Sequence, residues 1–103
     1  MLKKINRISS KKEFEEVKRL GVIKQYPYFG LIGHIGPLGS IKFGFIISKK
    51  ISKKAVVRNK IKRLLAEEVK KNLDKFENGF RGIFLIKKNI IDEKGNLKDI
   101  KLL

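Results

Sequence analysis

The sequence predicts one α+β domain over residues 1–103: a small mixed sheet of about four strands, an N-terminal helix, a central basic helix and a short C-terminal helix. Two patterns predict this class. Apolar residues recur at helical spacing over residues 10–20 and 54–73, and they alternate as in a strand over residues 28–35 and 41–48. With 103 residues, the chain is long enough to bury one modest hydrophobic core.

The N-terminal helix is expected to follow a basic arm over residues 2–8. Ser9 or Ser10 can cap its first turn, and Glu13, three residues after Ser10, completes the spacing of a capping box. Its apolar stripe consists of Phe14, Val17 and Leu20. Gly21 then ends the helix, because glycine is common just beyond a helix. The simplest role for Phe14 is contact with the core.

Three segments are expected to form strands: residues 28–35, 41–48 and 80–87. A turn at residues 36–39 separates the first two, which predicts that they pair antiparallel. One surface of this pair carries little side-chain bulk, because it contains Gly30, Gly33 and Gly44. Such glycines mark either a place where another chain approaches the backbone, or a bulge or tight twist. The sequence favours neither.

The central helix, over residues 54–73, lies in the most basic part of the chain. Within residues 48–63, eight side chains are basic and none is acidic. The apolar stripe of the helix consists of Val57, Ile61, Leu64, Leu65, Val69 and Leu73. A neighbouring face collects Arg58, Asn59, Lys62 and Arg63, since residues four apart stack along a helix. Like charges at that spacing destabilise a helix, so this face is expected to meet a polyanion; the alternative is a solvated basic face.

The connections of the basic helix suggest a strand–helix–strand unit over residues 41–87. If the two strands run parallel in one sheet, the usual crossover is right-handed. The tail beyond residue 92 is expected to form a short helix over residues 96–103.

The net charge restricts the classes of partner. Twenty-six Lys and Arg residues against ten acids give +16, and all ten acids lie outside residues 17–66. Such a field indicates nucleic acid, or less often an anionic membrane surface. A membrane partner is disfavoured because both long helices use their apolar faces for the core. Cysteines, bilayer-spanning apolar runs and a signal-peptide core are all missing from the sequence, so we expect a cytoplasmic protein.

The sequence offers little catalytic chemistry. His34 is the one histidine, and the acids are scattered. A nucleophile–base pair, a carboxylate dyad and a metal-ligand spacing are all lacking. We therefore expect no catalytic residue, no metal site and no small-molecule substrate in this chain.

Three motifs together resemble the bacterial ribonuclease P protein subunit. The first is Lys-Ala-Val-Val-Arg-Asn-Lys-Ile-Lys-Arg-Leu at residues 54–64, preceded by Gly-Phe-Ile-Ile-Ser-Lys-Lys at residues 44–50. The opening Leu-Lys-Lys-Ile-Asn-Arg-Ile at residues 2–8, with Phe14 and Gly21, also matches the start of that family. The resemblance covers about residues 2–88 and is specific as a combination.

The resemblance implies a non-catalytic partner of an RNA enzyme. Such a protein binds the ribonuclease P RNA and the 5′ leader of precursor tRNA, while the RNA catalyses cleavage with Mg²⁺. The RNA-subunit contacts implied are Lys49, Lys50, Lys53, Lys54, Arg58, Asn59, Lys60, Lys62 and Arg63. The leader-binding cleft implied consists of Phe14, Lys18, Ile32, His34, Lys42 and Ile46. The family also implies a left-handed crossover through the basic helix, which we adopt over the general rule.

The sequence departs from the family pattern at four positions. Lys60 replaces an arginine of the motif, which keeps the charge and loses the bidentate fork, and Ala66 stands where another arginine is common. Lys18 and Ile32 stand where cleft aromatics are common, so leader binding is expected to rely less on stacking. The alternative function is a general RNA-binding module, such as a ribosomal protein, with no processing role.

Overall fold

The computed structural model describes residues 2–36, 39–92, 94 and 96–98. Its helices are α1 (Lys11–Leu20) and α2 (Ala55–Lys71), and its strands are β1 (Val22–Gln25), β2 (Phe29–Ile35), β3 (Lys42–Ile46) and β4 (Phe80–Ile86). Short 3₁₀ turns occupy Lys4–Asn6, Leu73–Lys75 and Lys88–Ile90. The α+β class and the mixed four-stranded sheet are confirmed.

The strand order is β1-β2-β4-β3, with β4 antiparallel to β2 and parallel to β3. The predicted antiparallel pairing of residues 28–35 with 41–48 is therefore wrong, because β4 lies between the two strands. The reason is burial: β4 has a run of four buried residues, Arg81 to Phe84, and takes a central place where both faces are covered. The crossover from β3 through α2 to β4 joins parallel neighbours, and its left-handed sense stays a prediction.

β1 is the fourth strand, and no predicted range covered it. All four of its residues are exposed, so it lacks the alternation of a half-buried strand. It pairs with β2 from Val22↔Gly33 to Gln25↔Gly30, across a tight turn in which the Tyr26 N–H donates to the Phe29 carbonyl at 2.9 Å. An edge strand of this length is specified by its turn more than by its side chains.

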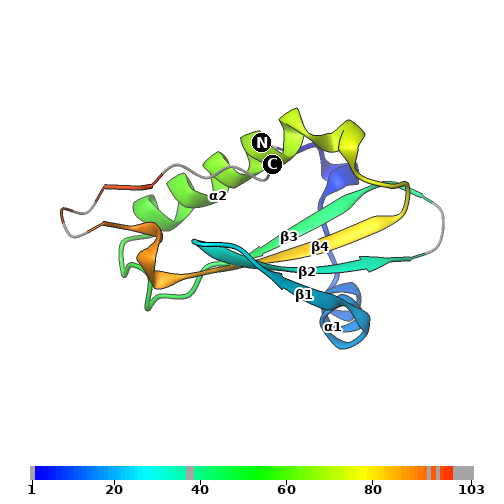
Figure 1. Ribbon diagram of the computed structural model, residues 1–103, viewed down its shortest axis with the longest axis horizontal. Helices are drawn as coiled ribbons and strands as arrows, with labels where there is room; N and C mark the ends of the chain where they lie inside the picture. Colours follow the sequence, from blue (N-terminus) through cyan, green and yellow to red (C-terminus); the bar gives the residue numbers. More distant parts are fainter. Residues whose placement is uncertain (1, 37–38, 93, 95, 99–103) are drawn as a thin grey trace.

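The main core lies between α2 and one face of the sheet (Figure 1). The helix buries Ile61, Leu65, Ala66 and Val69, and the sheet buries Phe29, Leu31, Phe43 and Phe84. The ring of Phe84 lies 5.3 Å from Phe29, 5.7 Å from Phe43 and 5.5 Å from Phe45, centroid to centroid. The predicted stripe is confirmed from Val57 to Val69 except at Leu64, which is 42% exposed. Leu73 packs against the core from the 3₁₀ turn after α2, and Ala66, which was not predicted, is buried.

The opposite face of the sheet carries α1 and a second, smaller core (Figure 1). Buried Ile8, Val17, Ile32 and Ile83 make this core, with Phe14, Ile46 and Leu85 packed against it. The predicted helix start is confirmed, because the Ser10 hydroxyl accepts from the Glu13 N–H at 3.1 Å. Gly21 is its C-cap, in extended rather than left-handed backbone.

The N-terminal arm extends the sheet at β3. Arg7 forms a parallel bridge with Phe43, and the Ile8 N–H donates to the Phe43 carbonyl at 3.0 Å. The Asn6 side chain donates to the Ile41 carbonyl at 2.8 Å, and Leu2 is buried at 5% exposure in the main core. The arm therefore shields part of an edge strand that would otherwise be open.

The predicted C-terminal helix is wrong over its described part. Leu97 forms an antiparallel bridge with Ile91, and the Lys98 N–H donates to the Ile90 carbonyl at 2.9 Å. The pairing brings Leu97 against the main core, which an isolated short helix starting at Asn96 would not achieve. Residues 99–103 of that prediction lie outside the described residues, as do Pro37 and Leu38 of the predicted turn.

Candidate nucleic-acid interface

The exposed side of α2 gathers part of the predicted RNA-binding set into one place. Asn59, Lys62 and Arg63 line a shallow hollow together with Val56, which is 75% exposed. Helical geometry explains the grouping, because these residues are three or four apart. The ion pairs between described residues involve Glu13, Glu15 and Glu16 of α1, so Lys62 and Arg63 have no acidic partner among those residues. This surface can therefore accept phosphates.

Arg58 has a structural contact that the sequence did not reveal. Its Nη1 donates to the Ser52 carbonyl at 2.8 Å, and the side chain is partly buried. This bond ties the first turn of α2 to the loop that precedes it. Lys60 is exposed on the same helix and does not line the hollow. Arg58 thus orders the start of the helix, whatever else its guanidinium binds.

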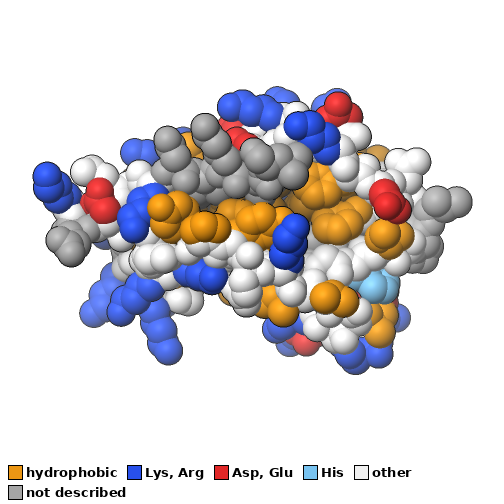
Figure 2. Space-filling model, in the orientation of Figure 1, with side chains coloured by type: hydrophobic (Ala, Val, Ile, Leu, Met, Phe, Trp, Pro, Cys, Tyr) orange, Lys and Arg blue, Asp and Glu red, His pale blue; other side chains and the backbone are white. Residues whose placement is uncertain are grey.

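The loop before α2 presents four exposed lysines, Lys49, Lys50, Lys53 and Lys54. Two serines order it: the Ser48 hydroxyl accepts from the Lys50 N–H at 3.2 Å, and the Ser52 hydroxyl accepts from the Lys54 N–H at 3.2 Å. Figure 2 shows Lys and Arg side chains projecting beside this loop, at the lower left. Because α2 also has no acidic residue in its first turn and no side-chain cap at Lys54, the helix dipole adds to the positive field here.

The predicted leader cleft lies on the α1 side of the sheet and is more closed than expected. Phe14 lies on Gly44, so closely that a Cβ at position 44 would collide with its ring. Ile32 is 9% exposed, while Ile46 is partly buried beside Phe14. Lys18 is exposed and lies 3.9 Å from the Glu15 carboxylate. Phe14, Lys18 and Ile46 keep accessible surface, and Ile32 serves mainly as core.

His34 and Lys42, also predicted for the cleft, belong to a charged network beneath α1. Its centre is Arg81, 7% exposed, whose Nη2 donates to Glu16 at 2.7 Å and lies 2.9 Å from His34 Nδ1. Arg81 Nη1 and Lys42 Nζ lie 3.5 Å and 3.6 Å from the Glu13 carboxylate. The hydrogen bond and charge of Arg81 lower the pKa of Glu16, with a smaller contribution from His34. This network clamps α1 to the sheet.

Sequence reasoning missed Arg81 and Arg7. A single arginine inside the apolar strand at residues 80–86 was a usable signal, because a buried charge requires a partner. Glu13 and Glu16, three residues apart on one helix, were the partners available. Arg7 was assigned only to a basic arm, and its position beside Phe43 follows from the bridge to β3.

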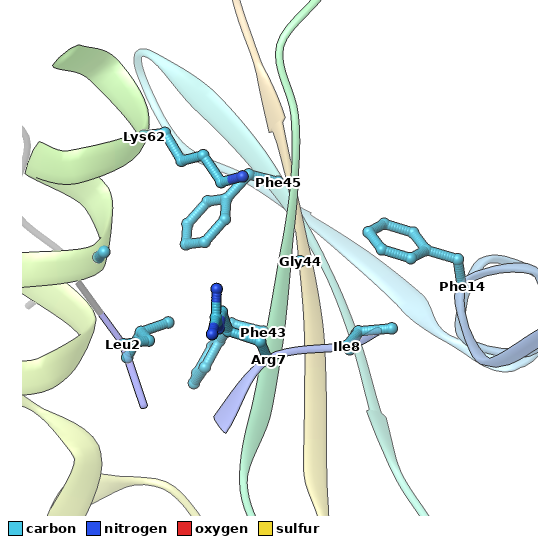
Figure 3. Close-up of a pocket in the computed structure, with 9 residues that line it drawn as sticks. Leu2, Arg7, Ile8, Phe14, Phe43, Gly44, Phe45 and Lys62 are labelled. Carbon is cyan, nitrogen blue, oxygen red and sulfur yellow. The ribbon is translucent and has the colours of Figure 1, made fainter. Parts of the chain in front are cut away.

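A hollow at the edge of β3 joins the two predicted RNA-binding surfaces. It is lined by Phe14 from the predicted leader cleft and by Lys62 from the predicted RNA-subunit face. In Figure 3, Phe14 and Phe45 lie on opposite sides of β3, with Gly44 between them and Lys62 reaching from α2 toward Phe45. The two surfaces therefore meet across this strand edge.

The described residues include no cluster of three or more His, Cys, Asp or Glu side chains able to hold a metal ion. Within the same part of the chain, neither helix has the length and apolar character needed to cross a membrane.

Comparison with known proteins decides the family. A family model described as Ribonuclease P matches residues 2–101. The chain belongs to the ribonuclease P protein family. The ribonuclease P protein component of Clostridium botulinum is 36% identical over 101 residues, covering 95% of this chain and 86% of the relative. That of Fusobacterium nucleatum is 34% identical over 101 residues, covering 94% and 84%.

The fold of this ribonuclease P protein also matches a solved one. The RNase P protein from Thermotoga maritima has a TM-score of 0.73 to this chain at 24% identity, covering 82% of this chain and 76% of that one. The order of strands and helices described above is thus a fold found in this family. The alternative of a general RNA-binding module, such as a ribosomal protein, receives no support from these similarities.

Proposed function

We propose that this chain binds the ribonuclease P RNA and the 5′ leader of precursor tRNA in the cytoplasm, and so assists maturation of tRNA 5′ ends. The observation that carries this proposal is the α2 surface. Asn59, Lys62 and Arg63 share one hollow, exposed lysines lead into the helix, and Glu13 and Glu16 of α1 are paired with Arg81. A face of that kind binds a phosphate backbone and does little for a neutral ligand.

The α2 face and its preceding loop are assigned to the RNA subunit. Their cations are exposed and lie on one helix and one ordered loop, which is a rigid arrangement. Rigid placement matters because two polyanions must be held close together for substrate cleavage. Each phosphate contact releases counterions, so binding is expected to weaken steeply with salt.

The leader is assigned to the α1 side of the sheet, at the surface that Phe14, Lys18 and Ile46 leave accessible. One partly exposed ring and one lysine offer stacking and charge on a small area. Ile32 is core, and His34 and Lys42 are held in the Arg81 network, so these three residues are expected to support the cleft rather than touch the leader.

Cleavage is assigned to the RNA subunit with Mg²⁺. Hydrolysis of a phosphodiester needs an activated water and stabilised charge, usually from metal ions held by clustered oxygens. Residues 17–66 contain no side-chain carboxylate, and this segment includes Asn59, Lys62 and Arg63 of the α2 face. Glu13 and Glu16 are already bound to Arg81. The protein is thus expected to neutralise phosphates while the RNA holds the metal.

A pull-down from cells tests the assignment of partners. Tagged protein is recovered at moderate salt, and the bound RNA is sequenced. Enrichment of the ribonuclease P RNA and of precursor tRNAs that retain a leader is the expected result. Enrichment of ribosomal RNA in proportion to its abundance, without the ribonuclease P RNA, would instead indicate a general RNA-binding module.

A further inference from the structure

The hollow at the edge of β3 has the features of a small binding site. Its volume is about 180 Å³, and it lies where the N-terminal arm, the sheet and α2 meet. Its apolar wall includes Leu2, Phe43 and Ala66, while Arg7 and Lys62 bring the two cations. Figure 3 shows Lys62 reaching toward the ring of Phe45 and Arg7 lying beside Phe43.

The space exists because of a small residue on α2. Ala66 is 2% exposed and faces the sheet, where its neighbours on the same side, Ile61, Leu65 and Val69, are larger. Its methyl group leaves the room next to Phe45 that a longer side chain would fill. The N-terminal arm closes the other side, because Leu2 and Ile8 are buried.

The chemistry of the lining favours an anion that carries an aromatic ring. The hollow has two cations and no acid in its lining, and both Arg7 and Lys62 are exposed without a described acidic partner. One face of the Phe45 ring packs on the nearly parallel ring of Phe84, with 5.5 Å between the centroids and 10° between the planes. A bound base would therefore have to stack on the other face of Phe45. A volume of about 180 Å³ slightly exceeds the ~150 Å³ of a cavity that holds benzene, so one ring system fits and a helix does not.

The backbone of β3 adds polar groups at the same place. The N-terminal arm pairs with β3 at Arg7↔Phe43. Alternate residues of a strand point their N–H and C=O groups to the same edge, so the next residue of β3 with backbone groups on this edge is Phe45. An edge strand presents such groups to whatever approaches it. A base in the hollow could hydrogen-bond there through its polar edge, while its ring stacks on an aromatic side chain.

We propose that this hollow binds one unpaired nucleotide of RNA, with the base beside Phe45 and its phosphate between Arg7 and Lys62. The proposal rests on the proposed function in that RNA is the partner. It adds a defined subsite where the α2 face and the Phe14 surface meet, so that a strand crossing the edge of β3 is held by both. Arg7 and Phe45 become specific contacts in addition to those predicted from the sequence.

The test uses the whole chain and adenosine 5′-monophosphate as the probe, with calorimetry for affinity and backbone amide NMR shifts for location. Inorganic phosphate and adenosine are compared at the same ionic strength. AMP is expected to bind more tightly than either, and to shift the amides of Phe45 and Ala66. Arg7→Ala and Lys62→Ala should each weaken AMP binding about tenfold, as expected for a lost charge-assisted contact.

Matched controls separate the site from diffuse attraction. Lys4→Ala removes an exposed charge from the same arm, and Lys70→Ala removes one from the same helix; neither residue lines the hollow. Both should leave AMP affinity within about twofold. Phe45→Leu keeps apolar volume and all charges, so it should weaken AMP while leaving inorganic phosphate unchanged. The amide spectrum of each variant confirms that it is folded.

Two results would overturn the proposal. AMP that binds no better than inorganic phosphate would mean that the hollow holds no base. Equal losses in all four charge variants would mean diffuse attraction without a site. A parallel cleavage assay with the RNA subunit separates failure of the subsite from failure of the proposed function. If wild-type protein stimulates cleavage but gives one of these two binding results, the subsite alone is refuted. If wild-type protein fails to stimulate cleavage, the proposed function itself is refuted.

Discussion

The ring of Phe14 in α1 rests on Gly44 in β3, at a place where any side chain on position 44 would collide with it. This contact gives Gly44 a role that neither of the two sequence alternatives named. The group that lies closely over the glycine is a side chain from a helix of the same chain. Phe14 is thereby anchored to the sheet with only part of its ring accessible.

Gly44→Ala is expected to destabilise the protein by about 1–3 kcal/mol, the usual cost of overpacking, because the added methyl must displace the Phe14 ring. Urea unfolding followed by circular dichroism measures it. Gly30→Ala is the matched control, since its new methyl would meet only the flexible side chains of Ile23, at 3.3 Å, and Gln25, at 3.4 Å. In the double variant with Phe14→Ala, the cost of Gly44→Ala should largely disappear. A full cost that persists there would place the strain elsewhere.

Phe14→Leu tests the leader surface. Leucine keeps much of the packing on Gly44 but cannot stack on a base, and such stacking is typically worth about 1–3 kcal/mol. Precursor tRNA with a leader should therefore lose more affinity than mature tRNA. The ratio of the two affinities is the readout, because the partly buried ring also contributes to stability. A lower melting temperature with an unchanged ratio would make Phe14 a purely structural residue.

The Arg81–Glu16 contact predicts how stability depends on pH. Arg81 lowers the pKa of Glu16 in the folded protein, through the hydrogen bond and its charge. The contact therefore stabilises the fold above the ordinary glutamate pKa of about 4.3, and this contribution is lost as pH falls through the lower folded-state pKa. Melting temperature measured from pH 6 to pH 3 should fall less steeply in Glu16→Gln than in wild type.

Glu15→Gln provides the control on the same helix, because Glu15 points to Lys18 and lies outside the Arg81 network. Its acid dependence should follow wild type. If melting temperature depends on pH identically in Glu16→Gln and wild type, the Arg81–Glu16 contact contributes no stability that depends on ionisation of Glu16.

Lys62→Ala and Arg63→Ala test the α2 face. Each should weaken binding to the RNA subunit and reduce the slope of log affinity against log salt by about one, if each residue contacts one phosphate. Lys75→Ala, at an exposed position beyond the end of α2, is the control. Equal slopes for all three variants would indicate diffuse charge attraction. Arg58→Ala is less suitable, because it also breaks the hydrogen bond to the Ser52 carbonyl.

The features predicted correctly from sequence are those with local causes. The Ser10–Glu13 cap and the buried stripe of α2 depend on residues three or four apart, so the sequence displays them directly. The basic face of α2 was predictable for the same reason. Family resemblance supplied the expected RNA partners, which residue patterns alone left open.

The features that the sequence did not reveal depend on distant contacts. The place of β4 between β2 and β3 is a choice among pairings, and a turn at residues 36–39 favours the wrong one. The Arg81 network joins Arg81 to Glu16, which is 65 positions away in the sequence, and to Glu13, which is 68 positions away. The hollow at β3 requires Arg7, Phe45 and Lys62 from three separate segments. Such groupings appear only once the chain is folded.

The central claim is that this chain assists an RNA catalyst and does not itself cleave RNA. The most direct measurement incubates rigorously RNA-free protein with precursor tRNA over a range of magnesium concentrations, with and without the cognate RNA subunit. Protein alone should give no cleavage at any concentration, since residues 17–66 supply no carboxylate for a metal ion. With the RNA subunit, cleavage should occur at the mature 5′ end, and the protein should lower the magnesium required. Cleavage by the protein alone, or an RNA reaction that the protein leaves unchanged, would contradict the account.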